Sequence, residues 1–368
     1  MEKYDFLIVG AGPSGCVMAE RLASIRKKIL MIDKRDHIGG NCYDYYDDFG
    51  VLVHKYGPHY FRAKDKVVID YLSNFTEWIE QRYKVAVCIK GKVYSFPINK
   101  KTIEQFFNVK LKDEEEVKRF LEERRQKEII EPKNAEEQVL SLVGKEIYEG
   151  FFKGYTKKQW GIEPKFLDKE VTARIPIRYN ENDDYIIEGF QAMPKEGYTK
   201  MFEKMISNKN IKLILSKTYE NNLSKIAKKI IWTGPIDEYF NYKFGNLPYR
   251  SLKFIFASFR KEYVQEIGQI NYPEEDIPYT RIVEIKHVTK QSCPNTTISI
   301  EFPEERGEPY YPMPTKEAKD LYKKYEELAK KEKNVYFLGR LAKYKYLNMD
   351  QCIEEALNLF EEIKNETL

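Results

Sequence analysis

A glycine-rich turn near the N-terminus has the residue types and spacing that bind the pyrophosphate of a dinucleotide. Residues 6–9 form a short apolar run, residues 10–15 read GAGPSG, and helix-forming residues follow. In such a strand–turn–helix unit, Gly10 permits the turn, Gly12 lets the backbone approach the pyrophosphate, and Gly15 lets helix and strand pack closely. The helix N-terminus adds amide donors and a partial positive charge. The pattern therefore predicts a dinucleotide site.

A second apolar run, Ile29 to Ile32, ends in Asp33 and completes a βαβ unit. A carboxylate at that strand tip can accept hydrogen bonds from a ribose diol. A plain structural turn is the alternative interpretation of the glycines, but strand, glycines, helix and acid in this order favour a cofactor. The following Gly39-Gly40-Asn41 adds backbone for a larger, flavin-bearing cofactor, which few NAD proteins carry.

Length and composition are typical of a globular enzyme of two or three domains. The chain has 368 residues, of which 33% are charged and 42% hydrophobic, and its 62 basic and 58 acidic side chains leave a net charge of +4. This balance, without a basic stripe, argues against a nucleic-acid partner. The five scattered cysteines show no CxxC spacing, and we find neither a signal sequence nor a run of about 18 apolar residues. We therefore expect a cytoplasmic protein without a membrane span.

Two of the four histidines, His54 and His59, lie just beyond the βαβ unit, with Arg62 close behind. None of the histidines is followed four residues later by a metal-ligand partner, so no metal site is predicted. An isolated histidine is usually a hydrogen-bonded structural residue. His59 follows a Gly-Pro turn, where loops at strand ends tend to line the cofactor site, and we expect it there.

The middle of the chain combines a hairpin with a helical insertion. Residues 85–96 alternate around a Lys-Gly-Lys turn and predict a β-hairpin. Residues 101–142 contain charged helical stretches in which Val117, Phe120 and Leu121 follow helical spacing, and the charges indicate a solvated face. We expect this insertion to interrupt the nucleotide-binding domain.

Two further central segments have no clear periodicity. Residues 151–161, FFKGYTKKQWG, concentrate aromatic and polar side chains without strand or helix spacing. Their rings are either core aromatics or a surface that stacks on a base and a sugar. Residues 174–197 are rich in Asn, Asp and Gly and predict a long surface loop, and such loops often serve as lids.

The C-terminal half returns to strands. Residues 211–215 and 230–235 predict two more strands of the nucleotide-binding domain, the second ending in a turn. The runs LKFIFASF, YTRIVEIKHV and TTISIEF, between residues 252 and 302, predict an antiparallel sheet that carries Arg281. This sheet suits a substrate domain.

A closing unit consists of a helix over residues 316–331, a strand over 335–338, Gly339-Arg340 and a last helix that begins near Asn348, with Gln351 three residues on to complete a capping box. The first turn of the last helix would direct amides and a positive dipole at the flavin pyrimidine and stabilise an anionic reduced isoalloxazine. A plain helix cap is the alternative.

Seven motifs in order resemble the bacterial type of UDP-galactopyranose mutase over essentially the whole chain. They are GAGPSG, DKRDHIGGN, HKYGPHYF, GYTKKQWG, IPYTRIVE, EPYYP and GRLAKYKYLNM. The first two are shared by many flavoproteins, whereas GYTKKQWG and the RIPIR segment after it are far more specific.

The resemblance implies a flavoenzyme that interconverts UDP-galactopyranose and UDP-galactofuranose without net redox change. In this family reduced FAD acts through N5 as a nucleophile on the anomeric carbon, displacing UDP and forming a flavin N5–sugar adduct, and the furanose supplies cell-surface polysaccharide. A homodimer is also implied. The implied α/β fold has a discontinuous Rossmann-like FAD-binding domain, an inserted helical domain with a mobile lid, and an antiparallel β-sheet substrate domain. Their expected ranges are 1–80, 205–242 and 315–368 for the first, 100–195 for the second, and 81–99 and 243–314 for the third.

The resemblance also assigns roles to individual residues. Arg174 and Arg281 align with the arginines that grip the diphosphate, an anion that a planar guanidinium fork matches. With His59 and Trp160 they form the catalytic set. The expected substrate-binding residues are Phe151, Tyr155, Thr156, Tyr185, Arg250, Asn271, Tyr311, Tyr346 and Arg62. The expected FAD-binding residues are Gly10, Gly12, Ser14, Gly15, Asp33, Gly40, Asn41, His59, Tyr60, Leu213, Arg340, Leu347, Asn348 and Met349.

Four positions depart from the family pattern. Arg62 replaces a histidine, Tyr83 stands where an asparagine contacts the nucleotide, Ile186 replaces an aromatic residue on the lid, and Asn348 replaces an aspartate. These changes affect the sugar and, to a lesser degree, the base. Because the longer Arg62 could reach an N-acetyl group, UDP-N-acetylgalactosamine is an alternative substrate.

Two other function classes compete with a mutase. An FAD-dependent amine or carotenoid-type oxidoreductase shares the first βαβ unit and the terminal Gly-Arg helix, and it predicts electron transfer during turnover. A non-catalytic sugar-nucleotide binder would bind UDP without isomerising a sugar. The arginine pair and the reducible-flavin architecture argue against the binder.

Overall fold

A computed structural model describes residues 3–366 and contains two main sheets. The first is a five-stranded parallel sheet. In spatial order its strands are β10 (Ile211–Ile214), β2 (Ile29–Ile32), β1 (Tyr4–Val9), β11 (Ala227–Trp232) and β17 (Val335–Phe337). The runs of β1 and β2 are apolar almost throughout because both faces of a parallel sheet are covered. The strands predicted near residues 211, 230 and 335 are thus confirmed as members of this sheet.

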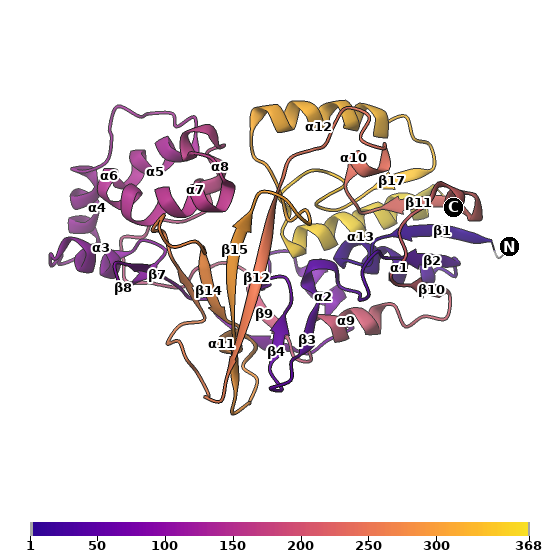
Figure 1. Ribbon diagram of the computed structural model, residues 1–368, viewed down its shortest axis with the longest axis horizontal. Helices are drawn as coiled ribbons and strands as arrows, with labels where there is room; N and C mark the ends of the chain where they lie inside the picture. The colour runs from indigo at the N-terminus through magenta and orange to yellow at the C-terminus, as the bar shows by residue number, and fades with distance from the viewer. Residues whose placement is uncertain (1–2, 367–368) are drawn as a thin grey trace.

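Helices from distant parts of the chain cover the parallel sheet. One face packs against α1 (Pro13–Ser24), α9 (Tyr198–Met205) and α13 (Met349–Asn365), which share one apolar core with β1 and β2. The helix α12 (Lys316–Ala329) packs beside β17, with α10 (Ile236–Tyr239) between them. Figure 1 shows that β1 and α13 lie together at one end of the molecule although they come from opposite ends of the sequence.

The second sheet has seven strands. In spatial order they are β16 (Tyr311–Pro312), β12 (Tyr249–Phe259), β15 (Thr296–Glu304), β14 (Arg281–Glu284), β13 (Gln269–Asn271), β7 (Val85–Ile89) and β8 (Lys92–Phe96). All neighbours are antiparallel except β13 and β7, which are parallel. The predicted hairpin of residues 85–96 is confirmed as β7 and β8, and Lys90 and Gly91 adopt the positive φ angles of its turn.

The strand expected over YTRIVEIKHV is shorter than predicted. Only β14 is extended, and α11 (Lys286–Thr289) follows at once. The cause is the buried Lys286, whose ammonium donates to the carbonyls of Cys293 (2.6 Å) and Asn295 (3.1 Å) and so holds a helical turn in place of a continuing strand.

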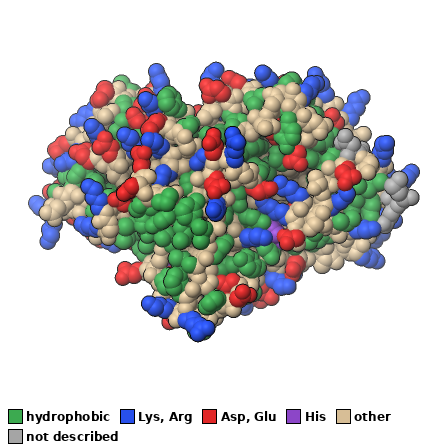
Figure 2. Space-filling model, in the orientation of Figure 1, with side chains coloured by type: hydrophobic (Ala, Val, Ile, Leu, Met, Phe, Trp, Pro, Cys, Tyr) green, Lys and Arg blue, Asp and Glu red, His purple; other side chains and the backbone are tan. Residues whose placement is uncertain are grey.

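One face of the seven-stranded sheet carries an uncovered apolar row. The strand register aligns Ile255, Ile300, Ile282 and Ile270 across four neighbouring strands, and none of the four is buried. Ile255 is 43% exposed. Figure 2 shows hydrophobic side chains gathered over this part of the molecule. The opposite face of the same strands carries Arg281 and other polar residues.

Short helices form a separate unit at the other end of the molecule (Figure 1). They are α3 (Lys100–Phe107), α4 (Glu114–Glu122), α5 (Ala135–Val143), α6 (Lys145–Ile147), α7 (Gly154–Trp160) and α8 (Glu170–Ala173). The expected spacing in α4 is confirmed, since Val117 and Leu121 are buried while its acidic residues face solvent. The unit packs on β7 and β8 through a shared apolar core.

The expectation that residues 151–161 are irregular was wrong. A π-helical turn (Tyr148–Lys153) leads directly into α7. A π turn holds one residue more than an α turn, so the apolar side chains before and after it fall out of a single 3.6-residue period. Phe151 and Phe152 are buried in the core of the helical unit.

Residues between α8 and β9 (Phe190–Pro194) carry no helix or strand within the described chain, in line with the predicted loop. The expectation was wrong for its last residues, because β9 pairs with β5 (Phe61–Ala63) and β6 (Trp78–Glu80). The remaining elements are β3 (Asp44–Tyr46), β4 (Leu52–His54), α2 (Lys66–Leu72) and short 3₁₀ helices at Gly40–Cys42, Pro164–Phe166 and Asn221–Ile226. No helix within residues 3–366 is both long and apolar enough to cross a bilayer.

Candidate functional site

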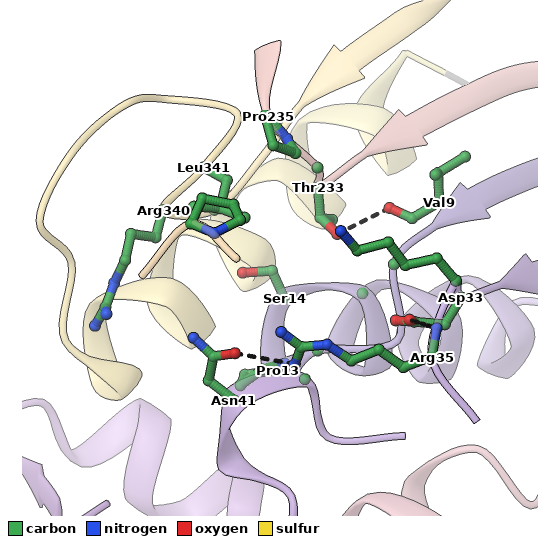
Figure 3. A pocket seen from close by; sticks show the side chains of 18 of the residues that line it. Val9, Pro13, Ser14, Asp33, Arg35, Asn41, Thr233, Pro235, Arg340 and Leu341 are labelled. Atoms are coloured by element: carbon green, nitrogen blue, oxygen red, sulfur yellow. Dashed lines mark hydrogen bonds between the residues drawn. The ribbon is translucent and has the colours of Figure 1, made fainter. Parts of the chain in front are cut away.

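A cavity opens where the parallel strands end and α1 begins (Figure 3). Most of the predicted cofactor residues line it. They are Gly10, Gly12, Ser14, Gly15, Asp33, Gly40, Asn41, His59, Arg340 and Met349. Asp33 lies toward one end of the cavity and Arg340 toward the other, with Ser14 between them. This elongated arrangement suits a dinucleotide whose pyrophosphate meets the N-terminus of α1.

The three glycines of the first turn have different structural roles. A Cβ on Gly10 would lie 2.0 Å from Thr233 Oγ1, and one on Gly15 would lie 2.0 Å from the Gly10 carbonyl oxygen, so both glycines are required by the fold. A Cβ on Gly12 would meet only Gly40 Cα, at 3.8 Å, and its φ of −78° is ordinary. The fold itself therefore tolerates a side chain at Gly12. The absence of one there leaves a cradle that fits a pyrophosphate.

Asp33 also stabilises the turn. Its carboxylate accepts hydrogen bonds from the amides of Ala11 (2.7 Å) and Arg35 (2.8 Å), and the residue is 8% exposed. Each carboxylate oxygen can accept more than one hydrogen bond, so the predicted ribose contact remains available. Beside it, Arg35 donates to Asn41 (2.9 Å; Figure 3), which fixes the second glycine turn against the first.

Four of the predicted cofactor residues lie outside the lining of this cavity. Leu213 packs into the apolar core from β10, and Tyr60 stacks on Tyr83 with 3.4 Å between ring centroids. The Leu347 carbonyl accepts a hydrogen bond from Arg340 (3.0 Å), and the amide of Asn348 donates to Gln351 (2.9 Å), which confirms the expected helix cap. Sequence reasoning missed some lining residues, which are Lys217, Thr218, Tyr219, Thr233, Glu308 and Tyr310. The turn after residue 232 was a signal for Thr233, and the EPYYP motif was one for Glu308 and Tyr310.

His59 lies at the cavity with a defined tautomer. Its Nδ1 is 2.9 Å from the Gly57 carbonyl oxygen, which can only accept, so Nδ1 carries the proton and Nε2 is an acceptor. Its backbone amide donates to Nδ1 of the buried His54 (3.1 Å). Burial lowers the pKa of both imidazoles, that of His54 to about 3. Both rings are therefore neutral near pH 7.

The buried imidazole of His54 predicts a loss of stability in acid. Histidine in the unfolded chain has a pKa of about 6.5. As the pH falls below that value, the unfolded chain binds a proton that the folded chain does not bind, and the free energy of unfolding decreases. Asparagine at this position retains an acceptor for the His59 amide but cannot be protonated. When the pH is lowered from 7.5 to 5, we expect the free energy of unfolding to fall by about 2 kcal/mol less in His54→Asn than in the wild type. Urea unfolding of both proteins at the two pH values measures this. An equal loss in both would contradict it.

A second group of predicted residues gathers around Arg174 next to the cavity. Its guanidinium lies 5.1 Å from the Tyr346 ring centroid, and that of Arg340 lies 5.0 Å from the same ring. The Tyr311 ring stacks on Tyr346, with 5.4 Å between centroids. Partial burial raises the pKa of the Tyr346 phenol, but the cations of Arg174 and Arg340 more than offset this and lower it below the usual value. The cluster is strongly electropositive and favours a dianionic ligand.

Arg281 projects into the same region from β14 and is held by a buried acid that the sequence reasoning missed. Glu301, only 1% exposed, accepts from Arg281 Nε (2.9 Å) and Nη2 (2.7 Å). The next strand places Asn271 directly opposite Arg281, and Gln269 donates to Asn271 (2.8 Å). The polar face of the sheet thus presents an oriented guanidinium.

Glu301 predicts a measurable effect on turnover. In Glu301→Gln the shape is kept but the ion pair is lost, so Arg281 is no longer held in one orientation. For the activity that the resemblance implies, we expect kcat/KM to fall by about 10- to 100-fold with the flavin retained. Glu304→Gln, at an exposed position on the same strand, is the matched control and should match the wild type. An unchanged or raised kcat/KM in Glu301→Gln would contradict this role.

Tyr155 and Tyr185 complete this region. Tyr185 lies against Tyr83, with 5.5 Å between ring centroids. Tyr346 raises the pKa of the Arg174 guanidinium most, and the nearby Tyr185 and Tyr155 raise it further. Trp160 and Thr156, each 5% exposed, follow on α7, and the Trp160 ring is 6.1 Å from that of Tyr311. The structure therefore brings most of the predicted substrate residues together.

Two predicted substrate residues have structural surroundings instead. Phe151 is 3% exposed and packs on Tyr94 and Phe106, so it belongs to the core of the helical unit. Arg250 is 7% exposed, and its guanidinium donates to the carbonyls of Gln159 (2.9 Å) and Lys158 (3.1 Å). It satisfies the last carbonyls of α7, as a cation at a helix C-terminus should. The described contacts of these two residues are structural, and a ligand contact by either of them stays a prediction.

Arg62 lies on β5 next to the start of α13. Burial raises the pKa of the Asp350 carboxyl, and the positive charge of Arg62 opposes this rise. Arg62 is thus placed at the Arg340 and Met349 end of the cavity, where the predicted reactive part of the cofactor and the sugar would meet.

Comparisons with known proteins agree with this arrangement. A family model described as UDP-galactopyranose mutase matches residues 150–346, and one described as an NAD(P)-binding Rossmann-like domain matches residues 8–75. The chain is 40% identical to a probable UDP-galactopyranose mutase of Klebsiella pneumoniae, over 98% of this chain and 95% of that protein. It is 37% identical to a dTDP-fucopyranose mutase of Escherichia coli, over 95% and 96% of the two chains. It is 33% identical to a UDP-galactopyranose mutase of Mycoplasma genitalium, over 96% and 93%.

Solved structures show the same fold. A crystal structure of reduced UDP-galactopyranose mutase superposes with a TM-score of 0.77 at 17% identity and covers 99% of this chain and 94% of that one. A putrescine oxidase superposes with a TM-score of 0.61 at 12% identity, with 99% of each chain covered. The expected α/β architecture, a Rossmann-like unit joined to a largely antiparallel sheet, is confirmed.

Proposed function

The chain belongs to the UDP-galactopyranose mutase family, and from that premise we propose that it converts UDP-galactopyranose into UDP-galactofuranose with reduced FAD and without net redox change. One observation carries the proposal. Arg340 lines the cofactor cavity and also lies 5.0 Å from the ring of Tyr346, so the cofactor site and the cationic cluster share a wall. A flavin and a sugar diphosphate bound in them would meet.

Bound FAD, once reduced, supplies the nucleophile for the anomeric carbon. We assign its pyrophosphate to the open side of Gly12 and the amides of Ser14 and Gly15, and its adenosine ribose to Asp33. We assign its isoalloxazine to the end of the cavity lined by His59, Arg340 and Met349. The N-terminus of α13 would stabilise negative charge on the ring there.

The chain itself stabilises the leaving diphosphate. Arg174 and Arg281 approach from the helical side and from the sheet, and each guanidinium can bind two phosphate oxygens at once. Tyr185, Tyr311 and Tyr346 add hydroxyl donors around them. Negative charge builds on the diphosphate as the bond to the sugar breaks, so two fixed cations lower that barrier more than they strengthen ground-state binding.

We assign recognition of the rest of the substrate to neighbouring residues. We assign the uridine to Tyr155, Thr156 and Asn271, which are outside the lining of the cofactor cavity, with Tyr155 near Arg174 and Asn271 opposite Arg281. Trp160 and Arg62 border the sugar. The E. coli relative named a dTDP-fucopyranose mutase makes base and sugar the properties to test first.

The cellular setting is also proposed. The substrate class and the five free thiols support a cytoplasmic location, and the furanose product would serve cell-surface polysaccharide. We propose a homodimer, and the uncovered isoleucine row on the seven-stranded sheet supports a contact between two copies.

A reduction-dependent assay tests the proposal. The purified FAD-loaded protein is incubated anaerobically with UDP-galactopyranose, with UDP-N-acetylgalactosamine or with dTDP-fucopyranose, with and without dithionite, and the pyranose and furanose forms are separated by chromatography. We expect UDP-galactofuranose only after reduction, with the other two sugars poorer substrates. Formation of furanose by the oxidised protein, or none from UDP-galactopyranose in either state, would overturn it.

A further inference from the structure

The side chain of Lys158 fastens α7 to the backbone of the loop between β13 and β14. The ammonium of Lys158 donates to the backbone carbonyls of Tyr272 (2.6 Å), Glu274 (2.7 Å), Ile277 (2.8 Å) and Tyr279 (2.9 Å). Four carbonyl oxygens that converge on one point repel one another unless a cation lies between them. An ammonium is a compact charge whose three protons can serve four acceptors when one proton is shared between two of them, and a planar guanidinium does not fit such a cluster.

On the same face of α7, Gly154 lets the helix backbone approach the loop closely. Gly154 precedes Lys158 by one helical turn, so the two residues face the same loop. A Cβ on Gly154 would lie 2.1 Å from the carbonyl oxygen of Pro273. The helix backbone therefore rests directly on the loop, and the lysine holds it there.

This junction lies between the two halves of the proposed substrate site. The loop starts after Asn271 and ends at Arg281, which belong to the sheet. The helix carries Tyr155 and Thr156, which stand between the two contact points Gly154 and Lys158. The relative placement of the helix residues and the sheet residues thus depends on this contact.

We propose that Lys158 is a positioning residue that sets the spacing between Tyr155 on α7 and Asn271 on β13 and thereby determines affinity for the nucleotide part of the substrate. The inference rests on the proposed function. Arg281 keeps its orientation through Glu301 and its strand neighbours, so loss of Lys158 should weaken nucleotide binding more than it slows the chemical step.

The test compares Lys158→Met with Lys157→Met in FAD-loaded protein. Lys157 is the adjacent control. It also reaches this loop, through Glu275 (2.9 Å), and it pairs with Glu163 (2.8 Å), but both ion pairs are partly exposed and should add little. The measurements are the Kd of UDP by calorimetry, the KM and kcat of the reduced enzyme, and flavin content. For Lys158→Met we expect the Kd and KM to rise about tenfold, with kcat within about threefold of the wild type and flavin unchanged. Lys157→Met should match the wild type.

A second variant covers the case in which Lys158→Met does not fold. Lys158→Gln retains an amide with two donors and should show a smaller rise in Kd and KM, and Lys158→Arg should not restore wild-type affinity. Folded Lys158 variants that bind UDP with wild-type Kd would overturn the inference, as would a fall in kcat at constant KM. Because the UDP Kd requires no turnover, an inactive wild type would refute the proposed function without deciding this one.

Discussion

Replacing Arg174 by alanine is expected to lower kcat/KM by about three orders of magnitude while FAD stays bound and the fold is unchanged. The residue is exposed, and its described partners are aromatic rings and not a buried acid, so its removal leaves no unpaired charge in the core. What is lost is one of the two guanidinium forks at the proposed diphosphate. The deficit should appear mainly in kcat, because charge on the diphosphate grows as the bond breaks.

Two variants make this result specific. Arg174→Lys keeps the charge without the fork and should recover part of the activity, whereas Arg260→Ala, at an exposed position at the end of β12, should behave as wild type. Steady-state kinetics of the dithionite-reduced proteins and their flavin spectra measure these effects. Wild-type kcat in Arg174→Ala would remove the residue from the mechanism.

Replacing Gly12 by valine is expected to produce a folded protein without FAD. The Cβ would make only an ordinary contact, 3.8 Å from Gly40 Cα, and the local φ of −78° suits any L-residue. A branched side chain there would occupy the space through which the pyrophosphate approaches the amides of α1. We expect flavin content to drop to less than about a tenth of the wild-type value.

Gly15→Ala provides the contrast, because its Cβ would lie 2.0 Å from a backbone oxygen and should damage the fold itself. Absorbance of bound flavin and circular dichroism separate the two outcomes. A yellow Gly12→Val protein with a full complement of flavin would contradict the proposed cofactor position. An unfolded one would mean that the glycine serves the fold, the alternative that the sequence left open.

The cofactor half of the site could be predicted from sequence because its determinants are local. Gly10, Gly12 and Gly15 belong to one turn, and Asp33 follows on the adjacent strand, so spacing alone places them. Motif resemblance likewise located Arg174, Arg281 and Tyr346, three residues that lie far apart in the chain and gather in the structure.

Contacts between distant segments could not be predicted in this way. The spacing of neighbouring residues predicts neither the ion pair of Glu301 with Arg281 nor the hydrogen bonds from Arg250 to α7. Each of these contacts depends on how one element packs on another. The resemblance assigned Arg250 a place in the site but could not predict that its guanidinium binds the last carbonyls of α7. Helix α7 was missed because the π turn before it interrupts the 3.6-residue spacing of the apolar side chains.

The most direct test of the account counts products per electron pair. The FAD-loaded protein is reduced once with a stoichiometric amount of dithionite, freed of reductant under argon and supplied with excess UDP-galactopyranose, while the flavin spectrum and UDP-galactofuranose are followed together. We expect many furanose molecules per flavin, with the flavin still reduced at the end. One product or fewer per flavin, with the oxidised spectrum appearing as product forms, would contradict it.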